Sequence, residues 1–138
     1  MKRALIPFIS LIVMAATLNA SPESSFIDKI WKALESGKAE SFITLYQPAL
    51  PDTLEPTFEQ LWQNPLDKGI SSVAIVPFSA KQSEAENKAL TIKGVTYVRP
   101  TPASAYLVIT FKDEKKSTGL IPLSQEKGKY YLASWKVE

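Results

Sequence analysis

The chain has 138 residues, with 16 basic and 14 acidic side chains and neither cysteine nor histidine. Two of the basic residues, Lys2 and Arg3, lie in the first twenty positions, so the rest of the chain is formally neutral, which argues against a nucleic-acid partner. The missing cysteine and histidine exclude thiol chemistry and histidine-dependent nucleophilic catalysis. Calcium-loop spacing and a glycine-rich phosphate loop are also missing, so we expect no metal and no other cofactor.

The first twenty residues have the order of a secretory signal peptide. Lys2 and Arg3 precede an apolar run over residues 4–18, and the small residue Ala20 stands before Ser21. This run is shorter than the roughly 20 residues that a spanning helix needs, so we expect cleavage after Ala20 rather than a permanent anchor. Membrane contact is then expected only through this segment, before cleavage. An exported chain without cysteine favours a bacterial periplasmic or secreted protein.

Apolar residues recur with helical spacing in the first part of the remaining chain. They predict helices over residues 22–36, 38–46 and 57–63. Gly37 suits the end of the first helix, because glycine tolerates the left-handed conformation that is common there. The proline-rich segment 47–56 is expected to be irregular. Pro65 is expected to stop or kink the third helix, because it has no amide hydrogen.

From Ile70 the apolar period changes to two, which predicts strands. The expected strands cover residues 70–78, 89–98, 105–112, 118–124 and a last segment in which Tyr131, Ala133, Trp135 and Val137 share one face. A polar hairpin connection is expected over 79–87, and a β-bulge at Lys93-Gly94, where the apolar parity flips. Helices followed by strands predict an α+β fold, with N-terminal helices packed against a strongly curved antiparallel sheet.

Three segments carry a resemblance to a known superfamily. They are FIDKIWKALESGKAESFITLY (residues 26–46), FEQLWQNPLDKGISSVAIV (58–76) and GKYYLASWKV (128–137). In this order the chain resembles the nuclear-transport-factor-2-like superfamily, which includes ketosteroid isomerases and polyketide cyclases. The resemblance implies a cystatin-like conical half-barrel over residues 21–138, a single domain that often encloses an apolar pocket and pairs through its outer sheet face. Such folds host enzymes, binding domains and assembly modules alike, and no catalytic residue is carried over.

Acid–base chemistry without histidine needs a carboxylate, tyrosine or lysine in a pocket. The acidic residues lie outside the faces that the apolar pattern predicts to point inward. Asp52 and Glu55, in the proline-rich connection, are the exception that could cover a pocket mouth, although exposure in a loop is the simpler interpretation. Aromatic residues are the ligand-pocket candidates, with core packing as the alternative for each. These candidates are Tyr46, Trp62, Tyr97, Tyr131 and Trp135.

The second face of the C-terminal strands is partly apolar, which suggests a protein partner and specifically a homodimer. The candidate dimer-face residues are Tyr106, Val108, Thr110, Leu120, Tyr130 and Leu132. An ordinary half-solvated sheet is the alternative. We therefore expect an exported, non-catalytic domain that binds a small apolar ligand or a protein partner in the cell envelope. A small acid–base enzyme of the isomerase or cyclase type is the alternative function.

Overall fold

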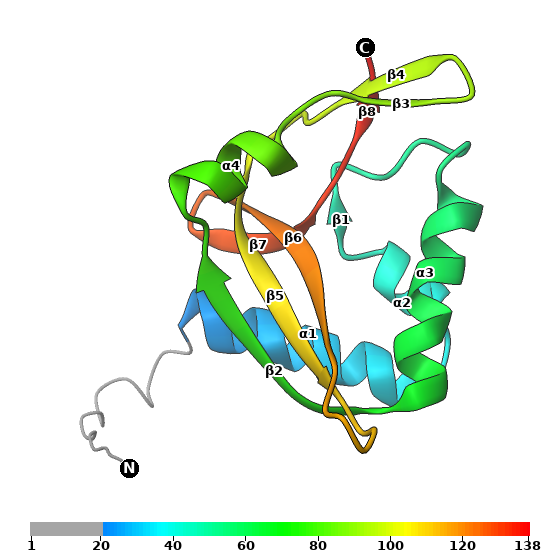
Figure 1. Cartoon of the computed structure of the whole chain (residues 1–138), viewed down its shortest axis with the longest axis vertical. Helices are drawn as coiled ribbons and strands as arrows, with labels where there is room; N and C mark the ends of the chain where they lie inside the picture. Colours follow the sequence, from blue (N-terminus) through cyan, green and yellow to red (C-terminus); the bar gives the residue numbers. More distant parts are fainter. Residues whose placement is uncertain (1–20) are drawn as a thin grey trace.

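The computed structural model describes residues 21–138, so the expected signal peptide lies outside the described residues (Figure 1). The helices of this part are α1 (Pro22–Ser36), α2 (Glu40–Ile43), α3 (Glu55–Lys68) and α4 (Ala80–Glu86). Its strands are β1 (Tyr46–Gln47), β2 (Ile70–Pro77), β3 (Leu90–Ile92), β4 (Val95–Val98), β5 (Ala103–Phe111), β6 (Thr118–Glu126), β7 (Lys129–Ala133) and β8 (Lys136–Val137).

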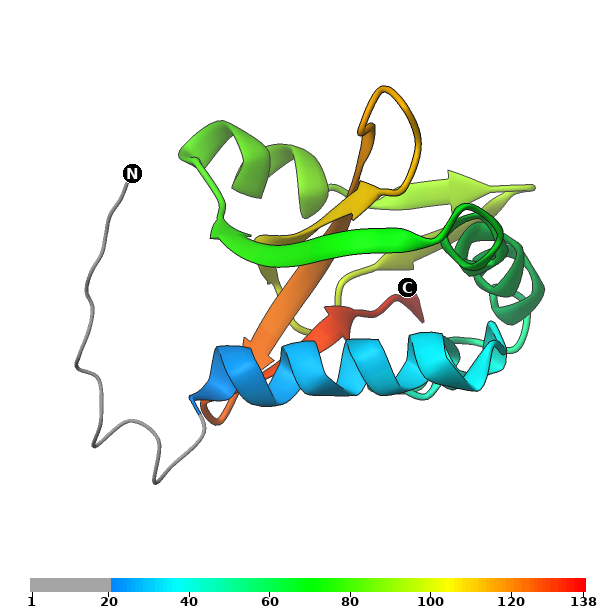
Figure 2. The same cartoon turned by 90° about the horizontal axis from the view of Figure 1, so that it is seen from below.

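The strands form two sheets. The larger has the order β1-β7-β6-β5-β2, and the smaller has the order β3-β4-β8. Strand β1 runs parallel to β7, and the other pairs are antiparallel. Figure 2 shows α1 along one side of the larger sheet and α4 on the other. Residues 21–138 therefore have the α+β architecture that the order of elements predicts, with a mostly antiparallel sheet.

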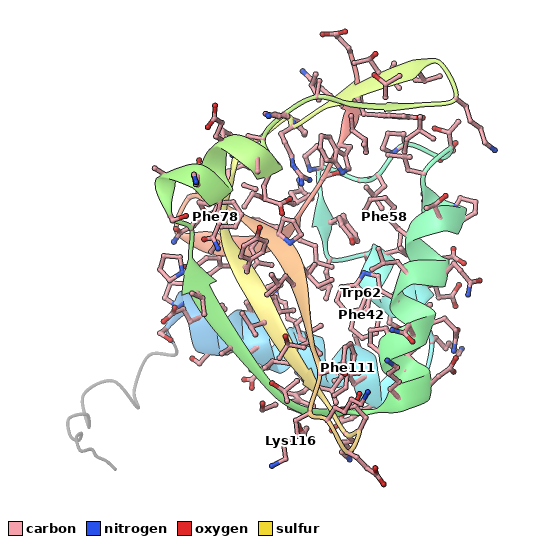
Figure 3. All side chains as sticks on the ribbon, in the orientation of Figure 1. Phe42, Phe58, Trp62, Phe78, Phe111 and Lys116 are labelled. Carbon is pink, nitrogen blue, oxygen red and sulfur yellow. The ribbon has the colours of Figure 1, made fainter. Side chains whose placement is uncertain are left out.

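The core lies between the first three helices and the inner face of the larger sheet. Leu107 of β5, Leu123 of β6 and Trp62 of α3 are fully buried in it. Phe42 of α2 stacks flat on Trp62, with ring centroids 4.1 Å apart (Figure 3). Each large apolar side chain buried in this way stabilises the fold by about 1.5–3 kcal/mol relative to its exposure. Packing of this kind holds together a domain that has no disulfide bond.

Helix α1 has the bounds predicted from its apolar period, and caps explain both ends. The amide of Ser24 donates to the hydroxyl of Ser21 at 3.1 Å, which satisfies one of the free amides of the first turn. Gly37 adopts φ of 70° at the other end, a conformation that costs little without a Cβ. Phe26 and Ile30 form the buried side, and the Phe26 ring lies 6.3 Å from that of Tyr130 on β7.

The next two helices differ from the prediction. Helix α2 is a single turn, and Tyr46, expected in that helix, lies in β1. Helix α3 continues through Pro65 to Lys68, where the predicted helix stops before the proline. Pro65 removes one amide from the ladder, but its ring is buried with Trp62 on the same side of the helix. Packing of that side outweighs the lost hydrogen bond.

Residues 79–87, expected as a polar hairpin connection, contain helix α4. Its start is a capping box, in which the Gln82 amide donates to the Ser79 hydroxyl at 3.2 Å. The Ser79 amide in turn donates to the Gln82 side chain at 2.8 Å. This reciprocal pair is a sequence signature of a helix start, and it stabilises a helix that has no buried residue of its own.

The parity flip at Lys93-Gly94 marks a hairpin and not a bulge. Both residues have positive φ, 51° and 82°, and Ile92 lies opposite Val95. A two-residue turn of this kind matches the twist of paired strands, so the chain reverses there. The expected single strand over 89–98 is therefore the pair β3 and β4.

The expected last strand is also two strands. The chain leaves the larger sheet after Ala133, and β8 pairs with β4 in the smaller sheet. Leu132 lies opposite Leu123 and is fully buried, so Tyr130 and Leu132 face the core and Tyr131 faces outward. This reverses the expected faces, because the period of two does not continue across the bend at Ser134.

Candidate functional site

An apolar recess lies where α3, β6 and the β7–β8 connection meet. Its volume is about 190 Å³. The residues that line it include Tyr46, Phe58, Leu61, Arg99, Leu120, Ile121 and Trp135. Phe58 lies on the side of α3 that faces the sheet, as does Trp62 behind it (Figure 3). Because β1 and β7 are paired and β8 pairs with β4, the recess lies at the junction of the two sheets.

Tyr46 forms one wall of the recess. Its pairing opposite Leu132 fixes its backbone, and its ring meets Phe58 edge-on at 5.4 Å. Its hydroxyl accepts a hydrogen bond from Trp62 Nε1 at 3.1 Å. Only 4% of the residue is exposed, and burial raises the pKa of Tyr46 to about 12. The side chain is therefore a neutral hydrogen-bond donor at any physiological pH.

Arg99 forms the opposite wall, directly after β4. Its Nε donates to the Glu86 carbonyl at 3.0 Å, and its Nη1 donates to the carbonyls of Ala133 and Ser134 at 3.2 and 3.3 Å. The guanidinium carbon lies 3.7 Å from the Trp135 ring centroid, a stacked cation–π arrangement. Burial lowers the pKa of Arg99 to about 10, so the group stays charged at neutral pH.

Glu86, the last residue of α4, connects Arg99 to the outer side of the sheet. Its Oε1 lies 3.7 Å from Arg99 Nη2, and its Oε2 accepts a hydrogen bond from the Tyr106 hydroxyl at 2.6 Å. That hydrogen bond raises the pKa of Tyr106 to about 12. The Tyr106 ring packs against the Phe78 ring, with centroids 4.6 Å apart. Through Glu86, α4 is tied both to the recess and to the outer sheet face.

A second hollow, of about 390 Å³, continues from the recess along α3. Leu61 and Ile121 border both hollows, and Ile109 and Phe111 extend the apolar wall. A Cβ added at Gly119 would stand 3.3 Å from the Phe111 ring, so the glycine leaves room for that ring. Lys68 Nζ lies 5.1 Å from the Phe111 ring centroid at the far end. The two hollows adjoin each other, sharing Leu61, Leu120 and Ile121 as lining residues, and together are called the groove.

Another hollow, of about 440 Å³, lies between the start of α1 and the β6–β7 turn. Its charged groups are Lys29, Lys127 and Lys129, all exposed to solvent. Exposed lysines hold a ligand weakly, because water screens their charge. The recess beside Arg99 differs because its polar groups are buried.

The sequence-predicted pocket residues separate in the structure. Tyr46 and Trp135 line the recess, and Trp62 lies behind Tyr46. Tyr97 borders a different hollow and shares a hydrogen bond of 2.9 Å with Thr53. Tyr131 faces the outer side of the sheet, away from the recess.

Arg99 and Glu86 are the site residues that sequence reasoning missed. Arg99 is the one arginine after Arg3, in a chain that otherwise uses lysine. Arginine is preferred over lysine where a planar cation must be buried and stacked. That isolated arginine was the available signal for Arg99, and the capping box of α4 was the signal for the helix that carries Glu86.

The dimer-face candidates also divide between the two sides of the sheet. Tyr106, Val108, Thr110 and Leu120 share the outer side, where Val108 lies opposite Leu120. Tyr106 is itself largely covered by Phe78, whereas 53% of Leu120 is exposed. Tyr130 and Leu132 lie on the core-facing side of β7, so their assignment to the dimer face was wrong.

Within residues 21–138, no three acidic groups gather to hold a metal ion, and no helix is long and apolar enough to cross a membrane. No protein-family model and no curated protein matches the chain. Among solved structures, a designed protein with an NTF2-like title, Rd1NTF2_05, is similar with a TM-score of 0.34 and 10% identity. The match covers 90% of this chain and 98% of the designed chain. A TM-score this low carries no conclusion about fold or function.

Proposed function

We propose that this protein is a non-catalytic binding protein that takes a small apolar ligand into the groove between α3 and the larger sheet. One observation carries the proposal: an apolar hollow of about 190 Å³ that adjoins a second hollow of about 390 Å³. Leu61, at the boundary between the two, remains 45% exposed although it lies on the wall of the groove. A ligand that covers such side chains gains about 25 cal/mol for each Å² of apolar surface removed from water.

The polar groups of the recess suit binding better than proton transfer. A general acid or base works best when its pKa lies near the operating pH. Tyr46 has a pKa of about 12 and Arg99 one of about 10, so each keeps its proton at neutral pH. Both therefore act as hydrogen-bond donors there.

We infer the family and the compartment from the sequence. Helices that precede a mostly antiparallel sheet support a nuclear-transport-factor-2-like half-barrel with a curved sheet. The charged start, the short apolar run and Ala20 support export and cleavage. N-terminal sequencing of the protein from a periplasmic fraction tests the second inference: a chain that begins at Ser21 supports it, and one that retains residue 2 contradicts it.

A protein partner is a second candidate, favoured by exposed apolar residues on the outer sheet face. Leu120 and Val76 are 53% and 46% exposed there. We propose a homodimer through this face, around Tyr106, Val108, Thr110 and Leu120. Leu120 also borders both hollows, so this dimer face would lie directly beside the groove.

The ligand proposal is tested with N-phenyl-1-naphthylamine, a neutral apolar dye that fluoresces when removed from water. We expect saturable binding that weakens about tenfold in Leu61→Lys, which places a charge on the groove wall. Val76→Lys is the matched control, since Val76 is equally exposed but lies on β2 outside the groove. No saturable binding to the unmodified protein, or equal losses in both variants, would contradict the proposal.

A further inference from the structure

Tyr46 and Arg99, which both line the recess, each carry a buried donor that makes no hydrogen bond to another group in residues 21–138. The Tyr46 hydroxyl accepts from Trp62, but its own hydrogen is not donated to any described group. Tyr46 is only 4% exposed, and it borders the recess. Buried polar groups are nearly always hydrogen-bonded, and an unsatisfied one calls for an explanation.

Arg99 supplies the second donor. Its Nε and Nη1 are hydrogen-bonded to backbone carbonyls, whereas the nearest carboxylate oxygen to Nη2, Glu86 Oε1, lies at 3.7 Å. That distance is too long for a hydrogen bond. The Arg99 side chain is 6% exposed, so Nη2 is a buried charged donor that is ion-paired with Glu86 but makes no hydrogen bond to it.

The charge of Arg99 is incompletely balanced. Burial lowers the pKa of Arg99, and the nearby Glu86 carboxylate, which is itself 30% exposed, raises it only in part. Glu86 also accepts the hydrogen bond from Tyr106, which stabilises its charge elsewhere. A second negative group on the recess side of Arg99 would therefore be stabilised.

We propose that the recess binds an apolar monocarboxylate, with the carboxylate accepting hydrogen bonds from Arg99 Nη2 and the Tyr46 hydroxyl. This inference rests on the proposed ligand-binding function and names the polar end of the ligand. Two free donors match two carboxylate oxygens, and one cation matches one charge. A neutral alcohol offers one oxygen and no charge, and a phosphate dianion exceeds the single cation of the recess. The apolar chain extends along α3 past Leu61 toward Phe111.

The test is calorimetric titration of the purified protein with decanoate and with decan-1-ol, which share an apolar chain and differ in the carboxylate. We expect decanoate to bind about tenfold more tightly, since a hydrogen bond to a charged group is worth roughly a factor of ten. Tyr46→Phe keeps the ring and removes the donor, and we expect the preference for decanoate to fall severalfold in it. Arg99→Lys keeps the charge and removes the fork, and we expect it to reduce the preference further.

Tyr97→Phe is the matched control. Tyr97 is equally buried, but its hydroxyl is paired with Thr53 in another hollow, so the preference should be unchanged. Near-ultraviolet circular dichroism confirms that each variant is folded. Equal binding of both probes to the unmodified protein overturns the carboxylate inference and leaves the groove as an apolar site. Binding of neither probe overturns the proposed function as well. A preference that survives in Tyr46→Phe and Arg99→Lys overturns the assignment of these residues.

Discussion

The core around Trp62 and the recess beside Trp135 are packed differently. Trp62 is fully buried, stacked on Phe42, and its indole N–H is paired with Tyr46. Trp135 is 8% exposed and stacks on Arg99, with a hollow beside it. Exposure hardly separates the two residues. What separates them is the hollow beside Trp135, so burial alone does not show which aromatic residue borders a pocket.

Truncating the two tryptophans tests this difference directly and has the largest expected effect. Trp62→Ala should lower the free energy of unfolding by about 3–5 kcal/mol, because it leaves a cavity in a closely packed region. Trp135→Ala should cost less, about 2–3 kcal/mol, since part of its ring already borders a hollow. Urea denaturation at neutral pH measures both values. Equal losses would show that the recess is packed as tightly as the region around Phe42.

The second prediction concerns the Tyr46 hydroxyl, which links Trp62 to the recess. Its pKa is about 12 in the folded protein and 10.0 without the fold, so its contribution to stability is present below pH 10 and is lost as pH rises toward 12. Between pH 9 and pH 11 the native protein should therefore lose about 1 kcal/mol more unfolding free energy than Tyr46→Phe. Urea denaturation at both pH values measures the difference. Parallel losses would mean that the hydroxyl is solvated.

Some parts of this structure could be predicted from the sequence and others could not. Helix α1 follows from its apolar period and its caps, and the strands of the larger sheet follow from alternation, because local chemistry determines both. The faces of β7 were predicted wrongly, since Trp135 belongs to a bend and not to the strand. Tyr46 and Trp135 were among the pocket candidates, but Glu86 and Arg99 were missed, because they meet Trp135 through tertiary structure, which periodicity does not encode.

The smallest expected effect on stability comes from the outer face of the sheet. Leu120→Glu places a charge on a residue that is 53% exposed, so the unfolding free energy should change by less than about 0.5 kcal/mol. If this face forms a homodimer, light scattering should show the native protein as a dimer and Leu120→Glu as a monomer. A native protein that stays monomeric at high concentration contradicts the dimer.

The recess draws its walls from widely separated parts of the chain. Tyr46 and Leu61 come from the first half, and Trp135 stands three residues before the C-terminal Glu138. The parallel pairing of β1 with β7 brings the two parts together. Because residues from both parts line the recess, it is complete only when these parts have docked in the folded chain. Ligand binding should then favour the completed fold over every shorter or partly folded form of the protein.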